Sequence, residues 1–176
     1  KNPPRVWALT HAIIHTEPGT FIQDGNIIIR DGQIEKVGKY IQLPNDAYEI
    51  DLEGAHVYAG FIESWVEVKK EEPPKSLRDH WSSKVRPEYR AIDDVSFKEK
   101  DLKQFRSLGF TMAHVIPKKG IFRGQSGLVT LSDPPKPVQS SIAQVMDFKY
   151  GGWGEREYPS SLLGVIAHIR QTFIDA

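Results

Sequence analysis

Three side chains in one short apolar stretch have types and spacing that could do chemistry. Residues 60–68 read GFIESWVEV and carry carboxylates at Glu63 and Glu67, with the indole of Trp65 between them. Successive side chains of a strand alternate between its two faces, so these three side chains would share one face. Two carboxylates at a strand end can act as general acid and general base. A solvated or salt-bridged pair of carboxylates is the alternative interpretation.

The same positions could hold a metal ion only if they supplied ligand atoms. Neutral imidazole is a good ligand for zinc and carboxylate is a usable one, whereas indole offers only an N–H donor. Trp65 therefore cannot bind a metal, and Glu67 alone would be a weak site. We expect no metal centre at this strand, and we expect Trp65 to fill the volume that an active site would leave open.

The residues around this stretch resemble the end of the first barrel strand in the amidohydrolase superfamily, the metal-dependent hydrolases that include imidazolonepropionase and dihydroorotase. In that family the strand reads Pro-Gly-Phe-Ile-Asp and continues into His-x-His, whose histidines hold a catalytic metal. Here residues 59–63 (AGFIE) keep the frame, and Trp65 and Glu67 replace the two histidines. Residues 50–54 (IDLEG) match the family's phrase that leads into the barrel. The resemblance implies an amino-terminal portion with a degenerate His-x-His motif.

Composition and charge exclude several classes of function. The 176 residues suit one ordinary domain or parts of two. Lys and Arg number 23, as do Asp and Glu, so the charge gives no general footprint for nucleic acid or an anionic membrane. No cysteine is present, which excludes disulfides and thiolate chemistry. No apolar run approaches the roughly 18 residues that a membrane helix needs.

The chain opens at Lys1 without a methionine, which suggests processing or an incomplete polypeptide. A targeting signal would then already be absent. The compartment is unknown from these residues, and an exported or periplasmic location is favoured over a cytoplasmic one as an expectation.

Residues 1–55 are predicted to form a β-rich segment. Apolar runs at 6–9 and 12–14 indicate short strands, and residues 26–30 and 33–37 flank Asp-Gly at 31–32. Asp-Gly between two β-rich runs predicts a type I′ hairpin, because that turn needs two positive φ angles. Short strands with close turns are typical of a small sandwich or barrel. The resemblance implies the small β-sandwich segment of the amidohydrolase composite domain, which would serve as scaffold.

Residues 56–176 are predicted to begin a β/α-barrel domain. Residues 56–62 are expected to form a buried strand, and residues 110–116 form the next strand. Between them, a capping-box pattern at 96–99 precedes a helix that ends at Gly109. Strand, helix and strand in this order predict a βαβ unit with parallel strands. Because a TIM-like barrel needs eight strands, the barrel in this chain would be incomplete.

Two other segments of the second part carry predictions. The long charged stretch 67–95 is expected to be a loop that covers a site or contacts another chain. The glycine-rich run 120–127 carries Arg123, a candidate anion contact, although a tight turn before a strand at 128–131 explains the glycines as well.

Two further elements are predicted near the end of the chain. Residues 142–149 are expected to form a further strand. The last helix opens at 158–161, with Pro159 in its first turn. Its side chains Leu162, Ile166, Ile169 and Phe173 recur at helical spacing, so this apolar face is expected to need a partner surface.

The histidines offer one pair at a spacing suited to a metal. His11 and His15 lie four residues apart, but no other ligand type is close in sequence, so a surface pair is the favoured interpretation. His114 lies inside the strand predicted at 110–116. It could face the barrel interior, and a packed or hydrogen-bonded imidazole is the favoured alternative.

Two hypotheses of function follow. The first is the amino-terminal part of an amidohydrolase-like protein, a scaffold of a larger hydrolase that acts on C–N bonds; no cofactor is expected in this region, and zinc is possible in the parent protein. The second is a non-enzymatic module that docks another protein through the last helix and the loop 67–95. The expected partner is the remainder of the polypeptide or another protein chain, with no nucleic acid and no membrane span.

Overall fold

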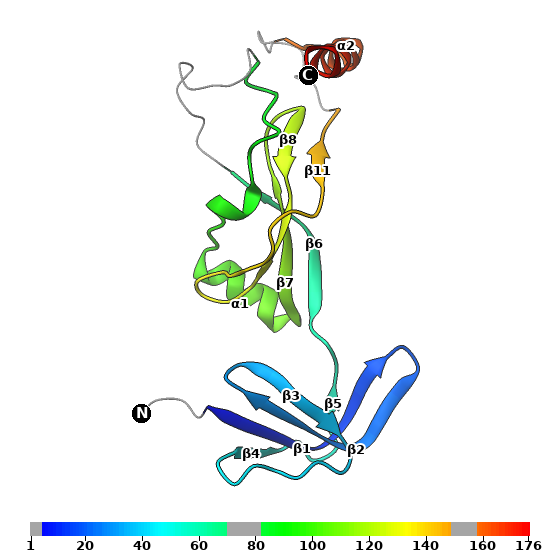
Figure 1. Cartoon of the computed structure of the whole chain (residues 1–176), viewed down its shortest axis with the longest axis vertical. Helices are drawn as coiled ribbons and strands as arrows, with labels where there is room; N and C mark the ends of the chain where they lie inside the picture. The colour runs from blue at the N-terminus through cyan, green and yellow to red at the C-terminus, as the bar shows by residue number, and fades with distance from the viewer. Residues whose placement is uncertain (1–4, 70–81, 149–157) are drawn as a thin grey trace. The chain divides into compact units, whose positions relative to one another are not determined.

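The computed structural model describes residues 5–69, 82–148 and 158–176 (Figure 1). The chain divides into two compact units, Lys1–Ala59 and Gly60–Ala176. Mixed α/β architecture with a majority of strands was expected from the sequence and is confirmed. None of the helices in the described ranges is long and apolar enough to cross a membrane.

The first unit is built on β1, Val6–Glu17. Its other strands are β2 (Thr20–Arg30), β3 (Gln33–Gly38), β4 (Tyr48–Asp51) and β5 (His56–Val57). The order is β3-β2-β1-β4, with β5 also on β1, and β1 runs antiparallel to β2 but parallel to β4 and β5. The two short runs predicted at 6–9 and 12–14 are one strand, interrupted by a bulge at which His11 has a φ of 53°.

The predicted hairpin turn between β2 and β3 is confirmed. Asp31 and Gly32 have φ angles of 50° and 79°, and Arg30 pairs with Gln33 across the turn. In this unit Ala12, Ile14 and Ile27 form one buried cluster, and Val6, Ala8 and Ile28 are buried as well.

The predicted βαβ unit is confirmed in the second unit. Strand β6 (Phe61–Val68) is followed by helix α1 (Glu99–Ser107) and strand β7 (Phe110–Pro117), and the two strands are parallel neighbours (Figure 1). The sheet continues as β10-β9-β7-β6, with β9 (Gly127–Thr130) antiparallel to β7 and β10 at Pro137–Gln139. A regular β/α-barrel would place a parallel strand there, so β9 departs from that pattern.

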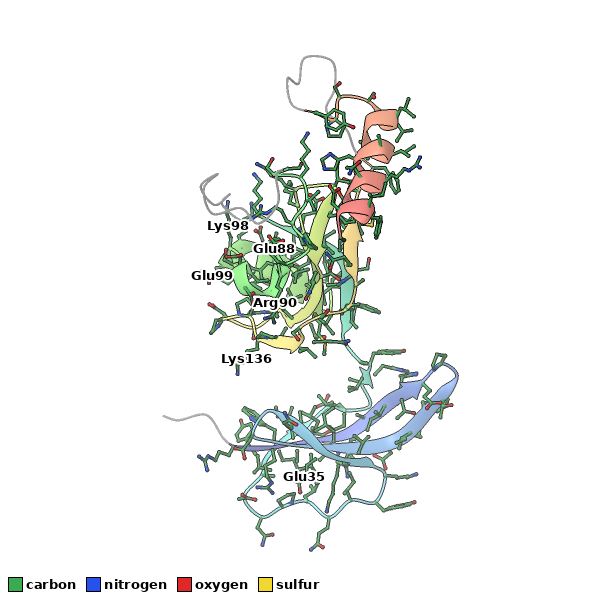
Figure 2. The ribbon with its side chains drawn as sticks, turned by 45° about the horizontal axis from the view of Figure 1, so that its top comes forward. Glu35, Glu88, Arg90, Lys98, Glu99 and Lys136 are labelled. Atoms are coloured by element: carbon green, nitrogen blue, oxygen red, sulfur yellow. The ribbon has the colours of Figure 1, made fainter. Side chains whose placement is uncertain are left out.

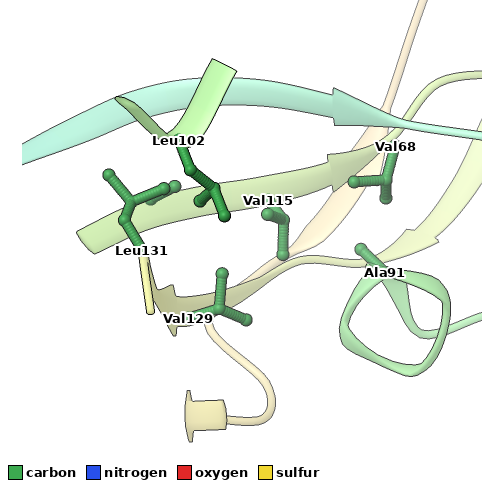
Figure 3. Close-up of a cluster of buried hydrophobic side chains, with 7 residues drawn as sticks. Val68, Ala91, Leu102, Val115, Val129 and Leu131 are labelled. Atoms are coloured by element: carbon green, nitrogen blue, oxygen red, sulfur yellow. The ribbon is translucent and has the colours of Figure 1, made fainter. Parts of the chain in front are cut away.

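Leu102 of α1 anchors the helix to the sheet (Figure 3). It packs in one buried cluster with Val115 of β7, Val129 of β9 and Val68 of β6. Ala91 belongs to the same cluster and comes from the 3-10 helix η2, Ala91–Asp94. These contacts hold the carboxyl ends of β6 and β7 in fixed register.

The prediction of one buried strand over 56–62 is wrong. Strand β5 ends at Val57, which pairs with β1, and strand β6 begins at Phe61, which pairs with β7. Phe61 and Ile62 are 62% and 52% exposed. The chain passes from one sheet to the other between these strands, so the apolar run belongs to two sheets and only Val57 of it packs against a core cluster.

The predicted capping box does not form. Helix α1 begins at Glu99 with Lys98 at the N-cap, and no side chain caps it (Figure 2). A capping box needs Glu99 at the third helical position, whereas it occupies the first and bridges Lys103 at 2.6 Å. The predicted end is confirmed, because Gly109 follows the helix with a φ of 87°.

The glycine-rich run 120–127 contains a strand where a turn was predicted. Strand β8 (Phe122–Gln125) pairs antiparallel with β11 (Gln144–Met146), and β9 follows at once. The strand predicted at 142–149 is therefore shorter than expected, and Lys149 lies outside the described residues. In the long segment 67–95, residues 70–81 are also outside them, and Val85 and Arg90 form isolated bridges to β8.

Helix α2, Leu162–Asp175, buries a different face from the predicted one. Ser161 is the N-cap and accepts a hydrogen bond from the Gly164 N–H at 3.1 Å, so Pro159 precedes the helix. The buried side chains are Val165 and His168, with Val165 in a cluster that includes Phe122 of β8. The predicted face is engaged only in part: Ile169 packs on that cluster and the ring of Phe173 contacts Phe122, whereas Leu162 and Ile166 are 49% and 48% exposed.

Candidate functional site

Glu67 lies on the face of the sheet that α1 does not cover. Val66 of β6 is paired with Val115 of β7, and both pack toward the α1 core. Glu67 is paired with Ile116 at the next position, and alternation places both on the opposite face. A register shift between Glu63 and Val66 breaks the predicted alternation, and Glu63 pairs with Ala113 of the α1 core, so the face of Glu67 is not shared by all three side chains as predicted. In a β/α-barrel this is the face that points inward.

Glu67 is held by two cations of its own chain. Its Oε2 lies 3.1 Å from Lys118 Nζ, just beyond the end of β7. Its Oε1 lies 3.2 Å from an Nη atom of Arg123 in β8. Both oxygens therefore have a positive partner. Of the two interpretations given from the sequence, acid–base chemistry and a salt-bridged carboxylate, Glu67 has the contacts of the second.

Arg123 connects this carboxylate to a second one. Its side chain is only 9% exposed, and its other Nη atom pairs with Asp147. The first Nη also donates to the Pro117 carbonyl at 3.3 Å. The anion contacts of Arg123 are thus carboxylates of this chain, Glu67 and Asp147. Whether it also meets an external anion stays a prediction.

The electrostatics of Glu67 follow from these contacts. The hydrogen bond from Lys118 holds the pKa of Glu67 below its ordinary value, and Arg123 adds to that effect, while burial opposes it. The carboxylate is thereby kept ionised and poorly suited to donate a proton near neutral pH.

The other motif side chains make local contacts. Trp65 is 59% exposed, so within the described residues it does not fill a buried volume, contrary to expectation. Glu63 accepts a hydrogen bond from the backbone N–H of Trp65 at 3.3 Å. The described contacts of Glu63 and Glu67 are with different groups, so no acid–base pair between them is evident in this part of the chain.

His114 of β7 is hydrogen-bonded, which is the alternative favoured from the sequence. Its Nδ1 lies 3.1 Å from the Ser64 carbonyl oxygen. A carbonyl can only accept, so Nδ1 carries the proton and the imidazole ties β7 to β6.

A cavity of about 470 Å³ opens where β6 and β7 end. Glu67 and Lys118 contribute to its wall, together with Asp94 near η2 and Asp101 and Phe105 of α1. Its lining mixes both signs of charge with aromatic surface. Parallel strands of α/β proteins carry ligand sites at their carboxyl ends, and this cavity lies at such a position.

The histidine pair of the first unit differs from the pair expected from the sequence. His11 Nδ1 lies 3.1 Å from an oxygen of Asp51, whereas His15 Nε2 lies 2.8 Å from Nδ1 of His56. Tyr58 stacks on His15 with ring centroids 4.1 Å apart. The parallel pairing of β5 with β1 brings His15 and His56 together. The spacing of histidines along the sequence could not predict this contact.

Metal-ligand types do not cluster in threes in the parts of the chain that the structure describes. At β6, Trp65 offers no lone pair, and Lys118 and Arg123 occupy the oxygens of Glu67. These residues do not fit a zinc ion as they stand.

Comparisons with known proteins give relatives of one kind. No protein-family model matches the chain. Two dihydroorotases, from Anaeromyxobacter sp. (strain K) and Anaeromyxobacter dehalogenans (strain 2CP-1 / ATCC BAA-258), are each 26% identical over 150 residues, which cover 70% of this chain and 34% of theirs. The crystal structure of an amidohydrolase from Thermotoga maritima MSB8 shares the fold with a TM-score of 0.68 and 22% identity, over 96% of this chain and 46% of that chain.

The chain spans about a third of the length of these curated relatives. The family resemblance drawn from residues 50–63 is confirmed, whereas the degenerate His-x-His motif is not tested by these matches and stays a prediction. The chain is thus similar in sequence to part of two dihydroorotases and in fold to part of an amidohydrolase, and both similarities support the amidohydrolase superfamily.

Proposed function

We propose that the chain is the scaffold portion of a larger hydrolase that acts on C–N bonds, and that its first barrel strand has no metal centre. In this proposal residues 1–55 belong to the small β-sandwich segment, and residues 56–176 begin an incomplete TIM-like barrel. The parallel β6–α1–β7 unit supports the barrel assignment.

One observation carries the proposal. The carboxylate at the second motif position, Glu67, is neutralised by Lys118 and Arg123, and the first motif position is an exposed indole. Lys118 and Arg123 therefore supply the positive charge that a bound metal ion would otherwise supply to Glu67. A dication brought to Glu67 would have to displace an ammonium and approach a buried guanidinium, both of which repel it.

The hydrolytic chemistry is assigned to the parent protein. In metal-dependent hydrolases a bound metal activates water for attack on an amide or cyclic amide carbonyl. Zinc would be held there by residues outside those described here. The contribution of this chain is the register of β6 and β7 and the cavity at their ends.

The test compares this chain with the native polypeptide from which it comes. The mass of that polypeptide, its zinc content and its hydrolysis of a cyclic amide such as dihydroorotate are measured beside those of the 176-residue chain. We expect zinc and activity in the longer polypeptide only. Zinc bound to the short chain, and released by Glu67→Gln, would refute the proposal.

A second candidate is a binding module, favoured by the uncovered side of α2. Leu163 and Ile174 are 76% and 66% exposed, on a helix whose other side is already packed. Isolation of a stable complex without hydrolase activity and without metal would support this candidate over the first. Leu163→Lys is the variant expected to break such a complex.

A further inference from the structure

We propose that His15 and His56 form a two-imidazole site for a divalent transition-metal ion, with Cu²⁺ and Ni²⁺ preferred over Zn²⁺. The proposal concerns the first unit alone and is independent of the hydrolase assignment. It begins from the 2.8 Å separation between His15 Nε2 and His56 Nδ1.

The backbone fixes the two histidines on neighbouring strands. Strand β5 pairs in parallel with β1 through Ile13 and His56, and the Ile13 N–H donates to the Ala55 carbonyl at 3.0 Å. Tyr58 stacks on the His15 ring at an interplanar angle of 9° and limits its rotation. The His15 ring is thus restrained by close stacking, while the His56 ring is exposed and lies farther from Tyr58, with centroids 6.3 Å apart.

The two rings now share a proton. Their centroids are 5.1 Å apart with an interplanar angle of 22°, and one ring donates its N–H to the lone pair of the other. When an ion binds, the bridging proton moves to the outer nitrogen of the donor ring, and both inner nitrogens present lone pairs. The rings turn so that the lone pairs converge on the ion, and this tautomeric change itself releases no proton.

The separation of the nitrogens selects among ions. An ion about 2.0–2.1 Å from both nitrogens would see them at about 85–90°, since they are 2.8 Å apart. That angle suits adjacent positions of a square-planar or octahedral ion, which are the geometries of Cu²⁺ and Ni²⁺. Tetrahedral zinc would need the nitrogens about 3.3 Å apart, so the strands or rings would have to separate further. Water would complete the coordination.

The experiment titrates the intact chain with CuCl₂, NiCl₂ and ZnCl₂ by calorimetry, with pulsed electron paramagnetic resonance of the Cu²⁺ form to count coordinated imidazoles. We expect one equivalent bound, two imidazoles on Cu²⁺, and affinity in the order Cu²⁺, Ni²⁺, Zn²⁺. His56→Gln should leave one imidazole and weaken Ni²⁺ binding at least about tenfold, since loss of a ligand costs no less than loss of an outer-shell partner.

Two further variants distinguish this site from metal binding elsewhere on the chain. His11→Gln, on the same strand, should leave binding unchanged, because its imidazole is engaged with Asp51. Tyr58→Leu should weaken binding by a smaller factor than His56→Gln, since it removes only the stacking on His15. Two imidazoles retained in His15→Gln/His56→Gln, equal loss in His11→Gln, or no saturable binding below about 1 mM ion would overturn the proposal.

Discussion

The two units use their polar side chains in opposite ways. In the second unit the chemically capable groups, Arg123 and Glu67, are paired with each other and partly withdrawn from solvent. In the first unit the imidazoles of His15 and His56 are bonded to each other at the surface. The Glu67 carboxylate of the second unit is therefore a salt-bridged structural group, whereas the first unit presents a pair of imidazoles at its surface. Position in a motif and availability for a ligand are separate properties.

The largest effect is expected from a matched pair of glycine substitutions, one in each unit. A Cβ at Gly124, whose φ is 112°, would collide with the Tyr89 carbonyl, whereas a Cβ at Gly32 would meet nothing within 4 Å. Gly124→Ala should lower the free energy of unfolding by about 3–5 kcal/mol, from strain and overpacking together. Gly32→Ala should cost about 1–2 kcal/mol, from strain alone. Urea denaturation with hydrogen exchange in each unit measures both, and equal costs would contradict the packing difference.

The next effect concerns the buried cation of the second unit. Arg123→Met leaves Asp147 and Glu67 without their shared guanidinium and should cost about 3 kcal/mol. The control Lys118→Met removes a cation whose side chain is 44% exposed and should cost less than about 1 kcal/mol. Thermal or urea unfolding compares the two. A larger loss from Lys118→Met would show that the surface ammonium, and not Arg123, holds Glu67.

A smaller effect is expected from acid. The pKa of Glu67 is lowered in the folded state, chiefly by Lys118, so its ionised form stabilises the protein above the ordinary value of 4.5. That stabilisation is lost as the pH falls through the lowered pKa. The free energy of unfolding of the wild type, relative to Glu67→Gln, should therefore shrink as the pH drops below 4.5. The same comparison in a Lys118→Met background should show a weaker pH dependence.

For the last variant we expect no change in zinc affinity. Changing Trp65 and Glu67 to histidine creates a His-x-His sequence, but Lys118 and Arg123 still repel a cation there, and the described residues supply no cluster of further ligands. Trp65→His/Glu67→His should therefore gain no tight zinc site. The measurement is calorimetry in a His56→Gln background, so that the imidazole pair of the first unit does not contribute. Submicromolar zinc affinity in that variant would contradict the expectation.

Local chemistry explains which structural predictions were correct. The hairpin turn at Asp31 and Gly32 and the helix end at Gly109 depend on single-residue φ preferences, and both are confirmed. The parallel β6–α1–β7 unit follows from the order of its elements. The capping box at 96–99 failed because the helix begins later, at Glu99 with Lys98 at the N-cap, and Leu102 is buried against the sheet from that start.

The candidate sites were less accessible to sequence reasoning. Glu67 and Arg123 are 56 positions apart, and only the placement of β8 brings them together. His15 and His56 are 41 positions apart and meet through a parallel pairing of a two-residue strand. No spacing rule along one strand or helix could reveal either contact. Trp65 and Glu67 were singled out because residues 59–63 beside them resemble the family. That resemblance does not predict which cations neutralise Glu67.

The central place of β1 sets an order of events in time. Its hairpin with β2 closes a short loop and can form within microseconds, before distant residues take part. Its parallel partners β4 and β5 follow long after it in the chain, so their pairing closes larger loops and comes later. The edge that β5 covers stays open until residues 56–57 arrive during synthesis. An ion coordinated by His15 and His56 would therefore stabilise the sheet only after β5 has paired with β1.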